Sequence, residues 1–183
     1  PMLITPIVVG VMWRALLNPD WGLVNWAIRQ VGLAPPDWLG SVEMGMVTLI
    51  LVDSWQWTPF VFILVFARLQ SLPLDVFEAA QVDGAGPITT FRRITLPMLM
   101  PAIVFAGIFR AVDSFRQFDL VYGLTFGGPV RTTTTLAFFS FQNGFQFQNF
   151  GYAAATAYAM LILLAVGMTV LLRFVAIRPG MAR

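Results

Sequence analysis

The chain has 183 residues, of which 58% are hydrophobic and 11% are charged. A soluble domain usually carries about 25% charged residues, so this composition indicates a protein largely surrounded by lipid. Cysteine and histidine are absent from the sequence, which excludes disulfides, thiol and imidazole chemistry and nearly all transition-metal sites. The net charge of +2 is too small and too scattered to favour nucleic-acid binding.

Four apolar stretches approach or exceed the length of about 20 residues that a helix needs to cross a bilayer. They are predicted at about residues 2–17, 44–67, 98–115 and 152–174. We therefore expect an all-α fold, a polytopic transmembrane helical bundle. The first stretch begins at Pro1 without a basic segment before it, which is not typical of a signal peptide. We interpret the chain as N-terminally truncated.

Two polar segments are expected outside these spans. Residues 22–31 have the pattern of a short amphipathic helix, which would lie on the membrane surface. The threonine cluster at residues 132–135 is expected to form an exposed turn.

The distribution of arginine predicts how the spans are oriented, because cytoplasmic loops carry an excess of basic residues. Six arginines lie after the second span or in the C-terminal tail, namely Arg68, Arg92, Arg93, Arg173, Arg178 and Arg183. The other side carries Arg29, Arg116 and Arg131. This bias predicts that the loop at about residues 69–97 and the C-terminus are cytoplasmic. With four spans, Pro1 would lie on the same side.

The cytoplasmic loop contains a short predicted helix. Asp75 and Glu78 have the spacing of a capping box, and Asp83-Gly84 supplies a C-terminal stop. A helix of about two turns is unstable alone in water, so we expect it to pack against another surface. The small side chains of Ala79 and Ala80 would let it enter a groove, with Glu78 as a polar anchor. From these residues alone, a docking element and a connector folded against its own bundle are equally compatible.

Several motifs resemble, in the same order, those of membrane subunits of ATP-binding-cassette (ABC) importers. The run Glu78-Ala79-Ala80, then Asp83-Gly84-Ala85 and then ITLP at 94–97, is similar to the EAA loop of that family. Four further motifs are similar to its carbohydrate-uptake branch: WRALLNPDWGLVN (13–25), DSWQWTPF (53–60), LQSLP (69–73) and FDLVYGLTFGGP (118–129). Within that branch, the chain resembles the type related to the larger membrane subunit of the maltose permease.

This resemblance implies that residues 1–183 are part of an ABC importer type I permease domain. Such a subunit lies in the inner membrane of a bacterial or archaeal cell and performs no covalent chemistry. It forms the translocation path with a second homologous permease subunit and receives its sugar from an extracytoplasmic binding protein. ATP and Mg²⁺ are bound by two separate ATPase subunits, so no cofactor is expected in this chain. The EAA loop would dock on an ATPase through Glu78, Ala79, Ala80, Asp83 and Gly84.

Polar side chains inside two of the spans form the candidate substrate site. An ionised carboxylate at a helix centre costs about 2.5–3.5 kcal/mol in a bilayer, so Asp53 must face protein or water. Offsets of three, four and seven residues put the members of each set on one helical face. The sets are Asp53, Gln56, Trp57 and Phe60 in the second span, and Arg110, Asp113, Ser114 and Gln117 in the third. Acids, amides and aromatic rings together suit the hydroxyl groups and C–H faces of a sugar.

In the maltose permease, the corresponding faces contact the sugar, and the resemblance implies the same role for these eight residues. Two simpler interpretations stay open: Asp53 makes only a structural hydrogen bond, and Arg110 and Asp113 only neutralise each other. The alternative function is a self-contained secondary transporter or channel that uses the buried acids and the arginine as an ion relay. A purely structural assembly subunit is a third reading. The resemblance leaves the substrate open among mono-, di- and oligosaccharides, polyols and glycerophosphates.

Overall fold

The computed structural model describes residues 1–176 and the side chains of residues 1–173, so Arg178 and Arg183 lie outside the described residues. Every regular element in this part of the chain is helical, which confirms the all-α class. The helices are α1 (Pro6–Leu16), α2 (Leu23–Gln30), α3 (Val42–Gln70), α4 (Leu74–Val82), α5 (Pro87–Thr90), α6 (Leu96–Phe115), α7 (Asp119–Leu124), α8 (Leu136–Phe141) and α9 (Phe150–Ala176). Two π-helical turns, η1 (Phe91–Thr95) and η2 (Gln142–Gln146), follow α5 and α8.

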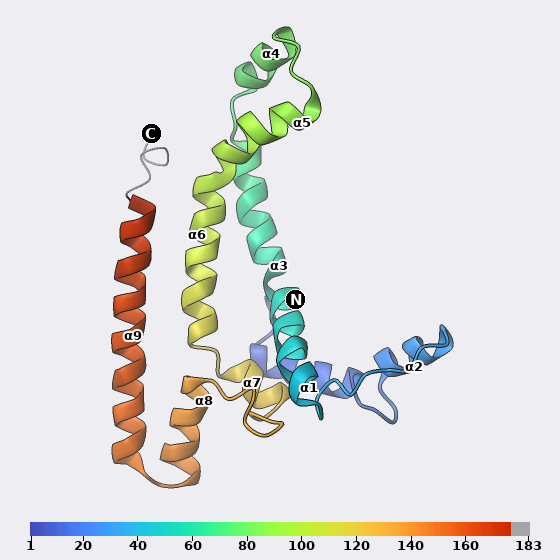
Figure 1. Ribbon diagram of the computed structural model, residues 1–183, viewed down its shortest axis with the longest axis vertical. Coiled ribbons are helices and arrows are strands. Elements are labelled where there is room, and N and C mark those ends of the chain that lie inside the picture. Colours follow the sequence, from blue (N-terminus) through green and yellow to red (C-terminus); the bar gives the residue numbers. More distant parts are fainter. Residues whose placement is uncertain (177–183) are drawn as a thin grey trace.

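Three of the four predicted spans correspond to helices that are long and apolar enough to cross a membrane. They are α3 with 29 residues, the continuous helix Pro87–Phe115 formed by α5, η1 and α6, and α9. At 1.5 Å per residue, α3 is about 43 Å long, which exceeds the bilayer core of about 30 Å. In Figure 1, α3, α6 and α9 run along the long axis, with α4 and α5 at one end and α1, α2, α7 and α8 at the other.

The first predicted span differs from the other three, since α1 has 11 residues and a length of about 16 Å. It lies against α7 at a glycine contact: a Cβ added at Gly123 would come within 2.5 Å of the Ile7 carbonyl oxygen. A Cβ at Gly10 would come within 2.8 Å of the Leu124 nitrogen. The segment before α1 reaches α3 beside Gln56, far from the α4 end where the orientation argument put Pro1. That this stretch crosses the membrane stays a prediction.

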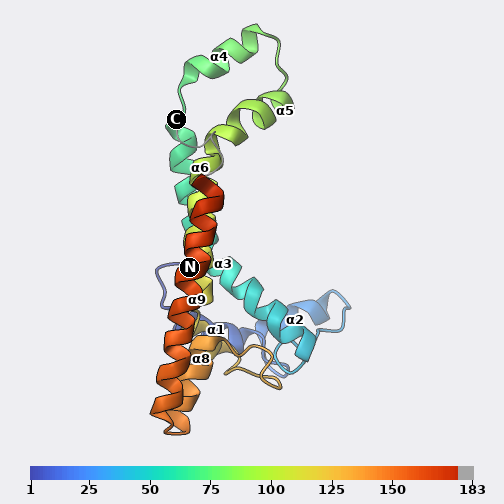
Figure 2. The same ribbon diagram turned by 60° about the vertical axis from the view of Figure 1, so that its left-hand side comes forward.

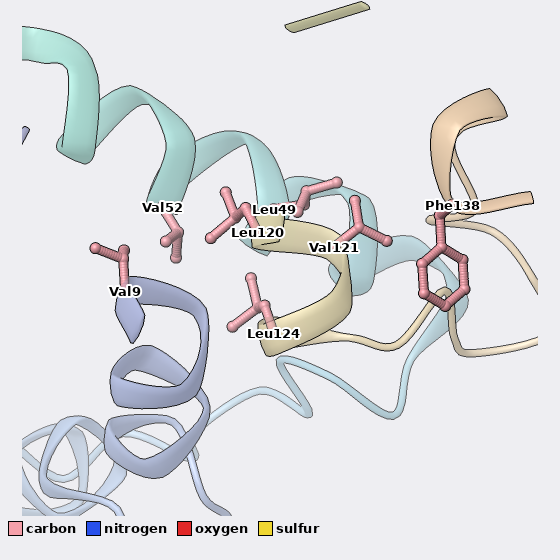
Figure 3. Close-up of a cluster of buried hydrophobic side chains, with 7 residues drawn as sticks. All are labelled: Val9, Leu49, Val52, Leu120, Val121, Leu124 and Phe138. Carbon is pink, nitrogen blue, oxygen red and sulfur yellow. The ribbon is translucent and has the colours of Figure 1, made fainter. Parts of the chain in front are cut away.

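The main apolar core lies where α1, α3, α7 and α8 meet. Its buried side chains are Val9, Leu49, Val52, Leu120, Val121, Leu124 and Phe138, and Figure 3 shows them gathered between these helices. By contrast, none of the most apolar stretch of α9 is buried within the described chain. The membrane-length helices therefore present apolar surface outward, as expected for contact with lipid or other helices.

Helix α3 bends near its middle (Figure 2). Pro59 lies inside the helix and has no backbone N–H to donate to the carbonyl of Trp55, four residues earlier. The hydroxyl of Thr58, the residue before Pro59, donates to the Ser54 carbonyl oxygen at 2.6 Å, a side-chain bond to the preceding turn that often accompanies helix bends. The bend changes the direction of α3 beside the polar residues that begin at Asp53.

The threonine cluster is not the exposed turn that the sequence predicts. Thr133 is buried, and its hydroxyl donates to the Gly128 carbonyl oxygen at 2.7 Å. The Thr135 hydroxyl donates to the carbonyl oxygen of Gln117 at 2.6 Å and also caps α8 by accepting from the Phe138 N–H. These threonines fold the loop before α8 back against the end of α6. A hydroxyl can replace water as a partner for backbone groups, which is why a polar run can be buried here.

Candidate functional site

The guanidinium group of Arg110 joins the two predicted polar faces. Its Nη2 donates to Asp53 Oδ2 on α3 and, at 3.2 Å, to Ser114 Oγ one turn along α6. Its Nη1 donates to Asp113 Oδ2. A second link between the helices runs from Gln117 Nε2 to Asp53 Oδ1 at 3.1 Å. Asp53 therefore makes the structural hydrogen bonds that one of the open interpretations requires, and it makes them to the facing set of residues.

The charged members of this cluster are largely shielded from solvent. The exposed fractions of the side chains are 14% for Arg110, 22% for Asp53 and 31% for Asp113. The Arg110 guanidinium also lies over the ring of Trp57, with its central carbon 4.6 Å from the ring centroid. A cation over an indole face is attracted by the ring quadrupole. We call Asp53, Trp57, Arg110, Asp113, Ser114 and Gln117 the Arg110 cluster.

Gln56 and Phe60, the other two members of the predicted set, have different neighbours. The buried Gln56 amide donates to the Ile4 carbonyl oxygen at 3.0 Å, and its Oε1 has no partner among the described residues. Phe60 packs between Trp57 and Phe109, with ring centroids 6.0 and 5.0 Å away. Offsets of three and four residues turn a side chain about 60° to one side and 40° to the other of the starting residue. Gln56 therefore faces the N-terminal segment, and Trp57 faces α6.

The Arg110 cluster borders a groove of about 740 Å³ between α3 and α6. The groove follows α3 from Asp53 toward the α4 end as far as Leu69. Its polar lining is Asp53, Ser54, Trp57, Thr58, Arg110 and Ser114, and the remainder is apolar. Four of the eight predicted site residues thus line this α3–α6 groove. Asp113 does not line it and instead contacts Arg110 from outside.

A second hollow of about 350 Å³ lies on the other side of the Arg110 cluster. It shares Asp53 and Ser114 with the α3–α6 groove and adds Gln117 and the three threonines Thr133, Thr134 and Thr135. We call it the threonine hollow. Sequence reasoning missed these threonines, although a polar run directly before an apolar helix was visible. Nothing local in the sequence indicates that residues 133–135 return to Asp53, some 80 positions earlier.

The other predicted site, the loop around α4, projects beyond the ends of α3 and α6 (Figures 1 and 2). Glu78, Ala79, Asp83 and Gly84 are exposed, whereas Ala80 is 6% exposed. Three large apolar side chains of this region are also strongly exposed: Leu74 at 73%, Val82 at 88% and Ile88 at 70%. The loop thus presents apolar surface at the end of the molecule and does not lie along the spans.

Of the two capping signals predicted for α4, the structure contradicts the one at the start of the helix and confirms the one at its end. The capping box is wrong, because Pro73 is the N-cap, Asp75 lies inside the first turn and no side chain caps the helix. The predicted stop is confirmed. Gly84 has φ of 72°, its N–H donates to the Gln81 carbonyl oxygen at 3.0 Å, and the Ala85 N–H donates to the Ala80 carbonyl oxygen at 2.9 Å. This pair of bonds is the Schellman motif, which needs a residue with positive φ at the position of Gly84.

The fold matches that of solved ABC transporters. One structure, titled as a bacterial ABC transporter involved in the import of the acidic polysaccharide alginate, has a TM-score of 0.84 at 24% identity. The match covers 95% of this chain and 61% of that one, and it confirms the predicted ABC importer permease fold. A second structure, of a bacterial alginate transporter in complex with an alginate pentasaccharide-bound periplasmic protein, has a TM-score of 0.77 at 26% identity. That match covers 95% of this chain and 59% of the other.

Sequence comparison gives the same relationship. The trehalose/maltose transport system permease protein MalF of Thermococcus litoralis is 35% identical over 163 residues, which are 89% of this chain and 55% of that protein. The chain spans about half the length of the curated relatives it matches. The model of the family described as binding-protein-dependent transport system inner membrane component matches residues 1–178. With its three membrane-length apolar helices, the chain is a multi-pass membrane protein that belongs to this family.

Proposed function

We propose that this chain is part of the permease subunit of an ATP-driven carbohydrate importer. The members of the Arg110 cluster that line the two hollows contact the sugar as it passes between this subunit and a second permease subunit. The α4 loop docks on an ATPase subunit at the cytoplasmic side, and the opposite end, with α7 and α8, receives the sugar from an extracytoplasmic binding protein. The substrate then moves by alternating access, in which the ATPases change the relative populations of outward-open and inward-open states.

The observation that carries the substrate site is the position of the Arg110 cluster at the junction of two hollows. The α3–α6 groove leads from Asp53 toward α4, and the threonine hollow leads from Asp53 back toward the start of α3 at Met46. The junction combines carboxylate, hydroxyl and indole groups. Sugar sites commonly need such groups, because hydroxyls are recognised by hydrogen bonds and C–H faces by aromatic surface.

The docking role of the α4 loop is supported by its exposure. A nine-residue helix has little stability of its own in water, and α4 carries two strongly exposed apolar side chains, Leu74 and Val82. Exposed apolar side chains at a helical tip are typical of a surface that another protein covers. The exposed Glu78 carboxylate would then supply a directional polar contact at the same surface. A connector folded against its own bundle would bury these groups within the chain.

The substrate role is tested by transport with the assembled complex. The full-length subunit would be reconstituted in vesicles with its second permease subunit, the ATPase subunits and the binding protein. We expect ATP-dependent uptake of at least one carbohydrate, and ATPase activity stimulated by that sugar and its binding protein. Solute transport by the full-length subunit alone, without any ATPase, would contradict the proposal and favour the self-contained secondary transporter.

The coupling role is tested by Glu78→Ala, with Glu43→Ala as the matched control. Both glutamates are exposed, but Glu43 lies in the first turn of α3 at the opposite end of the molecule. We expect Glu78→Ala to lower sugar-stimulated ATPase activity and uptake about tenfold or more, because a docked carboxylate partner is lost. Membrane insertion and thermal stability should stay as in the wild type. A loss of insertion in Glu78→Ala would instead support a structural connector.

A further inference from the structure

We propose that the carbohydrate carried through this site is electrically neutral, and that Asp113 sets this selectivity because, together with Asp53, it outweighs the positive charge of Arg110. The proposal rests on the proposed function, since it assigns a substrate class to the site at the Arg110 cluster. It also gives Asp113 a role that differs from direct sugar contact. Asp113 does not line the α3–α6 groove, and it holds Arg110 from outside that groove.

Both Nη atoms of Arg110 already donate to groups of this chain. Nη1 donates to Asp113, whereas Nη2 donates to Asp53 and Ser114. One face of the guanidinium lies over the Trp57 ring. A phosphate or carboxylate that paired with both Nη atoms would have to displace one of the two aspartates from a site in which all three charged side chains are at most 31% exposed. Removing one partner of a shielded ion pair leaves an uncompensated charge, which is strongly unfavourable.

The formal charge of the cluster also opposes an anion. One guanidinium and two carboxylates leave one net negative charge at the junction of the hollows. Among the described residues that line the α3–α6 groove or the threonine hollow, Arg110 is the sole cation. Asp53 lines both hollows, and the other polar groups are hydroxyls, an amide and an indole. These uncharged groups can donate hydrogen bonds to sugar hydroxyls or accept them, and none of them is a cation that would attract an anionic substrate.

The relatives show why the charge of the substrate is worth testing, because the substrates in their names are acidic in some cases and neutral in others. One solved relative imports an acidic polysaccharide, and the Thermococcus litoralis relative is named for trehalose and maltose, which are neutral. The fold is therefore compatible with either class, and the side chains of the site must make the distinction. The arrangement around Arg110 favours the neutral class.

The test measures ligand binding to the assembled transporter in nanodiscs, with the binding protein omitted so that its own selectivity does not enter. The ligands are matched pairs that differ by one anionic group: glucose with glucuronate, mannose with mannuronate, and glycerol with sn-glycerol 3-phosphate. We expect the neutral member of a bound pair to bind at least about tenfold more tightly. Tighter binding of the anionic member would overturn the proposal. Binding of neither class would instead overturn the substrate site of the proposed function.

Asp113→Asn removes one negative charge and keeps a side chain of similar size. We expect it to lower the preference for the neutral ligand about tenfold, because one unit charge near the ligand is neutralised in a partly shielded site. Asp113→Glu should retain the preference. The control is Asp119→Asn, at an exposed position in the first turn of α7 that lines neither hollow. An unchanged preference in a correctly assembled Asp113→Asn transporter would refute the role of Asp113, and the wild-type ratio tests the charge class even if this variant does not assemble.

Discussion

The Arg110 cluster and the α4 loop both place acidic side chains beside small or aromatic ones. The two regions differ in where the hydrogen-bond partners of these acidic side chains lie. In the cluster, Asp53 accepts from both Arg110 and Gln117, so the partners lie within this chain. In the loop, Glu78 and Asp83 are exposed, and α4 is ended by its own backbone turn at Gly84. The contrast teaches that a substitution in the cluster disturbs the bundle itself. One in the loop disturbs mainly what the loop contacts.

The largest effect on stability is expected for Arg110→Ala. It leaves Asp53 and Asp113 without their cation and removes a link between α3 and α6. We expect the free energy of unfolding to fall by about 3 kcal/mol, the lower part of the range for breaking a shielded pair. Thermal denaturation of the reconstituted transporter measures the loss. The control is Arg116→Ala, since Arg116 is exposed just beyond α6.

The same pair can be tested by a double-mutant cycle. Adding Asp53→Asn to Arg110→Ala should recover part of the lost stability, because one of the two uncompensated carboxylates is then removed. Strictly additive losses would show that Asp53 and Arg110 do not stabilise each other. That result would contradict the conclusion that the cluster is stabilised by partners within this chain.

A smaller loss is expected for Gly123→Ala, at the contact between α1 and α7. The added Cβ would lie 2.5 Å from the Ile7 carbonyl oxygen, so the two backbones would have to separate. We expect a loss of about 1–3 kcal/mol in the free energy of unfolding, as for other overpacked contacts. The matched control is Gly107→Ala in α6, where an added Cβ meets no atom within 4 Å. That variant should be neutral or slightly stabilising, because alanine favours helix more than glycine. Equal effects of the two changes would contradict the close contact of α1 with α7.

The smallest effect on the bundle is expected for Gly84→Ala in the loop. An alanine at φ of 72° costs about 1–2 kcal/mol locally and weakens the Schellman turn that ends α4. Because α4 projects from the bundle, we expect faster amide hydrogen exchange in residues 80–85 and unchanged thermal stability of the spans. Gly86→Ala is the control, since its φ of −70° suits any residue. A fall in the stability of the spans would show that the loop supports the bundle.

Several features of the fold follow from local sequence. Long apolar runs predict the membrane-length helices α3, α6 and α9, because a helix in lipid must be apolar over about 20 residues. The Asp83-Gly84 pair predicts the end of α4, because glycine adopts the left-handed conformation without steric cost. The start of α4 could not be predicted as well. Asp75 and Glu78 have the spacing of a capping box, but Pro73 begins the helix two residues earlier and shifts Asp75 into the first turn.

The candidate substrate site shows that helical periodicity predicts which residues share a face but not which neighbours they contact. Helical spacing correctly groups Asp53, Gln56, Trp57 and Phe60 on one face, but that face is about 100° wide. Which neighbour occupies each side of it depends on segments far away in the sequence. The segment before α1 contacts Gln56, whereas α6 contacts Asp53 and Trp57. The burial of Thr133 has the same origin, since it depends on the loop folding back to the end of α6.

The sequence by itself thus determined the class of protein, the long helices, the presence of a short helix in the loop between two spans and the identity of the polar groups inside the bundle. Only the tertiary structure decided that Arg110 is held between two aspartates, that Asp113 lies outside the groove and that two hollows meet at Asp53. The physical reason is that hydropathy and helix propensity act within a few turns. The pairing of charges is set instead by packing between helices that are 57 residues apart at the Asp53–Arg110 contact.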